Sequence, residues 1–178
     1  GKDYVALVYN ANNGNIIFEK DADKITYPAS LVKLMTLYLT FEALDKKELS
    51  LSQNLKVSSH GAEIARVNNG NSLHLKKGQK ITVEQAIRAV VVKSFNEAAV
   101  TLSESISGNE WSFVRLMNRT AKDLGMRNTN FRNASGLHQE DQYTTALDLA
   151  RLAYAIRTKF PHYYPVFASK SFNYNKKR

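Results

Sequence analysis

The segment 31–44 is apolar on nearly every side when it is drawn as a helix. Its apolar residues do not form a single stripe: they are Leu31, Val32, Leu34, Met35, Leu37, Tyr38, Leu39, Phe41 and Leu44. A helix without a polar face is stable only where protein surrounds it. We therefore predict a buried central helix over 31–44, with other elements packed around it.

The chain is long enough to build that surrounding core. It has 178 residues, of which 43% are hydrophobic, and this length requires only one folding unit. No apolar run approaches the ~18 residues of a membrane span, so we expect a soluble chain. The residues after Gly1 lack the pattern of an export signal, so we expect that such a signal is either absent or already removed. With no cysteine, the chain has neither disulfides nor thiolate metal sites.

Patterns along the chain predict strands near both ends and helices between them. Residues 4–9 and 16–20 are rich in β-branched and aromatic types and flank an Asn- and Gly-rich turn, which predicts a hairpin. Segment 49–80 is polar and rich in turn residues, so we expect an irregular excursion with short β-like pieces at 55–57 and 73–75. Helical spacings and a late β-like pattern predict four helices and a final strand, over 83–92, 97–106, 110–124, 145–158 and 167–174. This order predicts an α+β fold, with helices segregated from an antiparallel sheet.

Ser30 and Lys33 stand at the start of the predicted central helix, three residues apart. This spacing places the hydroxyl and the amine on one helix face, one turn apart. A serine hydroxyl needs a base to take its proton, and burial lowers the pKa of a lysine enough for that task. The N-terminus of a helix also presents free N–H groups to a developing oxyanion. The alternative is a serine that caps the helix and a lysine on the surface.

A second polar group, Ser94-Phe95-Asn96, lies between an apolar stretch and the predicted helix 97–106. A short loop there would expose the hydroxyl and the amide. The alternative again is helix capping, because Ser and Asn are favoured at N-caps.

These motifs and others in the same order resemble the low-molecular-mass penicillin-binding proteins of D-alanyl-D-alanine carboxypeptidase type, relatives of the serine β-lactamases. The resemblance covers nearly the whole chain and rests on 27–36 (YPASLVKLMT), 93–98 (KSFNEA), 113–118 (FVRLMN), 124–126 (LGM) with Thr129 and Phe131, 133–137 (NASGL), and 143–150 (YTTALDLA). One departure is Phe95, where such carboxypeptidases usually have Gly, and it affects only the local loop shape.

The resemblance implies a serine β-lactamase/penicillin-binding transpeptidase-like fold and a specific chemistry. Ser30 would be acylated by the D-Ala-D-Ala terminus of a peptidoglycan pentapeptide, with its backbone N–H in the oxyanion hole, and Lys33 would be the base. Ser94 would relay the proton to the leaving group, and Asn96 would hold the substrate amide. β-Lactams would acylate Ser30 as substrate mimics. No cofactor or metal is expected, and the family works outside the cytoplasm, in the periplasm or cell envelope.

The third motif of the family, Lys-Thr-Gly or Lys-Ser-Gly on a late strand, does not occur in this sequence. Lys76-Lys77-Gly78 is no substitute, because it lies between the first two motifs and lacks the hydroxyl residue. We therefore expect residues 1–178 to form a single catalytic domain that is incomplete at its C-terminal end, with sheet strands in 1–48 and 165–178 and a helical region over about 49–164. Any membrane anchor would lie outside this chain.

Other function classes have less support in the sequence. The net charge of +9 could attract an anionic polymer, but the basic residues are dispersed and do not alternate with aromatics, so we expect no nucleic-acid partner. A Ser/His/Asp hydrolase would need a Gly-x-Ser-x-Gly elbow, which is absent. The histidines near Glu63 and Glu140 lack the helical spacing of a metal site. The alternatives left open are a D,D-endopeptidase of the same family and a non-catalytic module that binds an anionic wall polymer.

Overall fold

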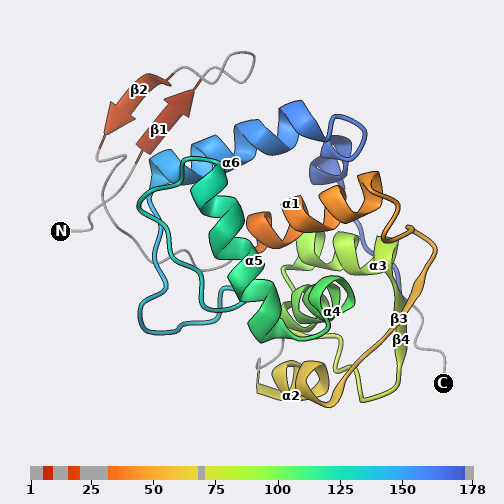
Figure 1. Cartoon of the computed structure of the whole chain (residues 1–178). Helices are drawn as coiled ribbons and strands as arrows, with labels where there is room; N and C mark the ends of the chain where they lie inside the picture. The colour runs from red at the N-terminus through yellow and green to blue at the C-terminus, as the bar shows by residue number, and fades with distance from the viewer. Residues whose placement is uncertain (1–5, 10–15, 21–31, 68–70, 175–178) are drawn as a thin grey trace.

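The computed structural model describes residues 6–9, 16–20, 32–67 and 71–174. Ser30 and Leu31 lie outside these described residues. The predicted central helix is confirmed as α1 (Val32–Asp45), in which every residue except Leu34, Glu42 and Asp45 is buried. Figure 1 shows α1 in the middle of the molecule with other helices around it. Because no side of α1 is free, the polar side chains in its first turns must be satisfied inside the protein.

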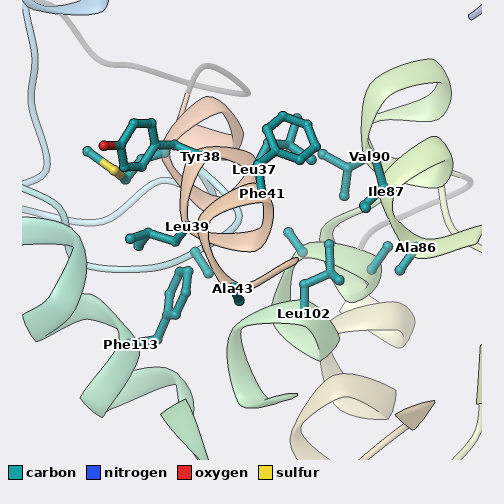
Figure 2. Packing of buried hydrophobic residues seen from close by; sticks show 14 of the residues in the cluster. Leu37, Tyr38, Leu39, Phe41, Ala43, Ala86, Ile87, Val90, Leu102 and Phe113 are labelled. Atoms are coloured by element: carbon teal, nitrogen blue, oxygen red, sulfur yellow. The ribbon is translucent and has the colours of Figure 1, made fainter. Parts of the chain in front are cut away.

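The helices around α1 are those that the spacings predicted, with small differences at the ends. They are α3 (Val83–Arg88), α4 (Asn96–Ser107), α5 (Glu110–Asp123) and α6 (Ala146–Lys159). α4, α5 and α6 all contact α1 directly. Figure 2 shows the resulting core, in which Leu37 and Phe41 extend from one side of α1 and Leu39 extends from another side, towards Phe113. No helix in the described part of the chain has the length and apolar character needed to cross a membrane.

Two small antiparallel sheets accompany the helices. β1 (Ala6–Tyr9) pairs with β2 (Ile16–Lys20), which confirms the predicted hairpin over its described residues. β3 (Asn54–Lys56) pairs with β4 (Lys80–Thr82) in the register Asn54↔Thr82. The piece predicted at 55–57 is therefore a strand. The piece predicted at 73–75 is not, because the N–H groups of Leu73 and Leu75 donate to the carboxylate of Glu97 on α4 instead of to a neighbouring strand.

Two expectations about other segments of the chain are wrong. Segment 49–80 contains a helix, α2 (Ser59–Val67), which packs on α4. The strand predicted over 167–174 is absent: a 3₁₀ helix (Tyr164–Ala168) is followed by chain without regular structure. Its aromatic residues pack on rings rather than alternate across a sheet, with Phe167 against Phe41 and Phe172 against Phe95.

Candidate active site

Lys33 lies in the first turn of α1 and is only 5% exposed, so the alternative of a surface lysine is wrong. Its Nζ donates to Asn96 Oδ1 at 2.7 Å and to the Ser135 carbonyl at 2.5 Å. Both acceptors are neutral, and no carboxylate of the described residues forms an ion pair with Lys33. Burial therefore lowers the pKa of Lys33 from 10.5 to about 8. At mildly alkaline pH a large fraction of this amine is neutral and able to accept a proton.

Ser94 lies directly after a π-helical turn, Ala89–Lys93, that continues α3. Its backbone has φ 56°, a left-handed conformation that is unusual for a residue other than glycine. The Ser94 N–H donates to the Val90 carbonyl at 3.0 Å, which holds this conformation in place. π-Helical turns and strained residues occur often at functional sites. No hydrogen bond joins Ser94 to Lys33 within the described part of the chain.

Asn96 is the first residue of α4 and is 7% exposed. The N-cap of α4 is Phe95, which makes no side-chain capping bond. Neither Ser94 nor Asn96 therefore acts as the cap that the alternative proposed. Instead the side-chain oxygen of Asn96 accepts a hydrogen bond from Lys33, while its amide nitrogen donates to no described residue.

The loop 133–136 completes the surroundings of Lys33; it is included in the family resemblance, through 133–137, but no role was predicted for it from the sequence. The Ser135 carbonyl accepts from Lys33, and the preceding Ala134 carbonyl accepts from Thr36 Oγ1 at 2.7 Å. Thr36 lies one turn after Lys33, so two successive carbonyls bind two successive turns of α1. The contact is made by backbone, whose carbonyls carry no residue-specific signal.

A buried carboxylate stands beside Asn96 on α4. Glu97 is 1% exposed and accepts from the Ser72 hydroxyl at 2.5 Å and from the N–H groups of Leu73 and Leu75 at 2.7 and 3.0 Å. One side chain thus ties the segment 71–75 to the helix that carries the Ser94/Asn96 motif. These hydrogen bonds were not predicted from the sequence, because a single Glu after Asn forms no recognisable motif.

The chain is similar in sequence to known carboxypeptidases. A family model described as D-alanyl-D-alanine carboxypeptidase matches residues 3–178. The chain is 36% identical over 148 residues to the D-alanyl-D-alanine carboxypeptidase DacF of Bacillus subtilis, covering 83% of this chain and 37% of that protein. It is 32% identical over 168 residues to the carboxypeptidase DacC of Escherichia coli, covering 93% and 42%. It is also 32% identical over 152 residues to a D-alanyl-D-alanine endopeptidase of Pseudomonas aeruginosa, covering 85% and 46%.

Solved structures give the same likeness in three dimensions. Penicillin-binding protein 5 of Haemophilus influenzae matches with a TM-score of 0.90 and 30% identity, over 97% of this chain and 50% of that one. Penicillin-binding protein D2 of Listeria monocytogenes, solved in an ampicillin-bound form, matches with a TM-score of 0.71 and 32% identity, over 89% and 62%.

Proposed function

The chain belongs to the D-alanyl-D-alanine carboxypeptidase family, and from this we propose that the protein carrying it removes the terminal D-alanine from peptidoglycan stem peptides that end in D-Ala-D-Ala. The α+β fold predicted from the sequence is confirmed as the fold of penicillin-binding proteins. The chain spans 37% and 42% of the length of DacF and DacC, so the activity is proposed for the protein that carries these residues.

The proposed reaction has two steps. Ser30 Oγ attacks the carbonyl carbon of the penultimate D-Ala while Lys33 Nζ takes the hydroxyl proton. The backbone N–H of Ser30 supports the oxyanion. The C–N bond then breaks, and the departing D-Ala amine receives a proton relayed through Ser94. Water next attacks the ester on Ser30, which releases the shortened peptide and restores the hydroxyl. Asn96 binds the substrate amide through its side-chain nitrogen.

The observation that supports this mechanism most directly is the amine of Lys33, which is buried and, among the described residues, forms hydrogen bonds only to neutral acceptors. A lysine of ordinary pKa is protonated at neutral pH and cannot act as a base. Burial between two neutral acceptors lowers the pKa of Lys33 to about 8. The same contact to Asn96 brings the second motif to the first, although the two are 63 residues apart in the chain.

β-Lactams are the inhibitors that this mechanism predicts. Their amide would acylate Ser30 in place of the peptide, and the Listeria homologue has been solved in an ampicillin-bound form. We place the protein outside the cytoplasm, in the periplasm or cell envelope, because its proposed substrate is a wall peptide. A D,D-endopeptidase is the second candidate, supported by the P. aeruginosa relative, since cleavage after D-Ala in a cross-link uses the same acyl-enzyme.

A peptide assay tests this proposal and separates the two candidates. The protein carrying the chain is incubated with a soluble pentapeptide ending in D-Ala-D-Ala and with a cross-linked dimer, and released D-Ala and monomer are quantified. We expect D-Ala from the pentapeptide, and a loss of roughly 10²–10⁴-fold in Lys33→Met. Release of monomer alone would support the endopeptidase, and no cleavage of either peptide would contradict the proposal.

A further inference from the structure

The loop that supplies the Ser135 carbonyl to Lys33 is held from its opposite side by α5. The first residue of α5 is Glu110, and its Oε2 accepts the Ala134 N–H at 3.0 Å. On the other side, Thr36 donates to the carbonyl of Ala134 and Lys33 to that of Ser135. The peptide backbone at 134–135 therefore lies between a carboxylate of α5 and two polar side chains of α1.

The Glu110 carboxylate is itself fixed in place. Its second oxygen, Oε1, lies 2.7 Å from His60 Nε2 on α2. The Glu110 side chain is 17% exposed and that of His60 is 45% exposed. Glu110 thus contacts α2 through one oxygen and the loop through the other, and neither oxygen is free to rotate away without breaking a hydrogen bond.

We propose that Glu110 is a positioning residue for Lys33: by holding the Ala134 N–H, it sets the place of the Ser135 carbonyl and thereby of the Lys33 amine. This inference rests on the proposed function of Lys33 as the base. Glu110 acts through the loop and contacts neither Lys33 nor the Asn96 side chain in the described hydrogen bonds.

The energetic effect follows from burial. Ala134 is fully buried, so removing its acceptor leaves an unpaired N–H inside the protein, and the loop must shift to satisfy it. A shift of the Ser135 carbonyl weakens its bond to Lys33, and that bond favours the protonated amine. The pKa of Lys33 then falls further below its ordinary value, and the amine loses one of the two contacts that orient it. Acylation should become slower at the plateau of its pH–rate profile. The acid limb of that profile, over which the rate rises as Lys33 loses its proton, should move to lower pH.

No titratable side chain of the described residues hydrogen-bonds to Lys33, so its charge is governed by these neutral groups. From α4 the amide oxygen of Asn96 faces it, and from the loop the Ser135 carbonyl does. On the other side of the loop lie Glu110 and His60, and the cavity that these two line is also lined by the charged side chains of Glu104, Arg115 and Arg132.

Glu104 provides a matched control, because its side chain lines the same cavity as Glu110. A cavity of about 640 Å³ is lined in part by His60, Glu104 and Glu110. Glu104, on α4, accepts from Ser58 Oγ with both oxygens, at 2.7 and 2.9 Å, and has no bond to the loop 133–136. Glu104→Ala removes a partly buried carboxylate from the same cavity without releasing the Ala134 N–H.

The test measures the acylation rate by a fluorescent penicillin against pH, in the protein carrying the chain. We expect Glu110→Ala to lower the plateau about tenfold and to move the acid limb down by about half a pH unit. Glu110→Gln should stay within about twofold of the unsubstituted protein, because its amide oxygen still accepts the Ala134 N–H. If Glu110→Ala does not fold, Glu110→Asp, which withdraws the carboxylate by one methylene, should move the limb in the same direction.

Each result decides the inference. A limb that stays in place in both Glu110→Ala and Glu110→Asp would overturn it, and so would an equal shift in Glu104→Ala, which would indicate a general packing effect. An equal loss in Glu110→Gln would overturn positioning by a hydrogen bond. If the unsubstituted protein is not acylated at any pH, the proposed function itself fails and the inference fails with it.

Discussion

At the scale of single residues, Lys33 combines deep burial with neutral hydrogen-bond acceptors, and this determines how activity should vary with pH. Its pKa is lowered to about 8, so the amine loses its proton as pH rises through that value. Because only the neutral amine accepts the Ser30 proton, we expect acylation to increase with pH and to reach half its plateau near pH 8. The measurement is the rate of acylation by labelled penicillin across the pH range. A rate that falls with pH, or that ignores it, would contradict this role of Lys33.

Ser94 carries two separable properties, its hydroxyl and its strained backbone. Ser94→Ala and Ser94→Gly both remove the proposed relay, so both should lose D-Ala release. Glycine adopts φ 56° without strain, so Ser94→Gly should be more stable than Ser94→Ala by about 1 kcal/mol. Thermal unfolding of the two variants measures this difference. Equal activity in Ser94→Ala and the unsubstituted protein would exclude the relay.

Among the elements, α4 depends on Glu97 to hold the segment 71–75. Glu97→Ala removes the acceptor of one hydroxyl and two backbone N–H groups. We expect the free energy of unfolding to fall by about 2–4 kcal/mol, measured by urea denaturation. Glu84→Ala on α3 is the control, because its ion pair with Arg88 is exposed and should contribute under about 1 kcal/mol. A similarly small loss of unfolding free energy in both variants would show that the hydrogen bonds of Glu97 do not stabilise the segment 71–75.

The elements also show which structural features a sequence can predict. The helix α1 and the motifs around Lys33 and Asn96 follow from apolar spacing and from residue types that carry chemistry. The helix α2 does not, because it is stabilised by packing on α4 rather than by its own propensity; a Cβ on its Gly61 would lie 3.5 Å from Thr101 Oγ1 of α4. Aromatic residues at 167–174 match a strand pattern, but ring packing decides their structure.

Inside the candidate site, too, contacts that depend on tertiary packing could not be predicted from the sequence. Ser135 contacts Lys33 through a backbone carbonyl, which any residue type could supply. Glu97 and Glu110 each stand in the first turn of a helix, where an acidic residue is ordinarily explained by the helix dipole. Only the packing of distant segments reveals that each carboxylate holds a loop. Their roles therefore depend on tertiary structure and could not be predicted from local pattern.

At the scale of the whole molecule, residues 1–178 carry the proposed nucleophile, base and relay without a Lys-Thr-Gly motif. The family resemblance assigns that motif to the wall of the cleft that receives the substrate carboxylate. We therefore expect residues 1–178 alone to release little or no D-Ala from a pentapeptide. The control is the protein that carries the chain, assayed at the same concentration. Turnover by the shorter chain at a comparable rate would contradict this expectation.

The central claim is that Ser30 is the nucleophile of an acyl-enzyme and that Lys33 activates it. The most direct test treats the protein carrying the chain with labelled penicillin and locates the label by mass spectrometry of its peptides. We predict one covalent adduct, on Ser30, that is absent in Ser30→Ala and forms far more slowly in Lys33→Met. A label on another residue, or undiminished labelling of Ser30→Ala, would contradict the account.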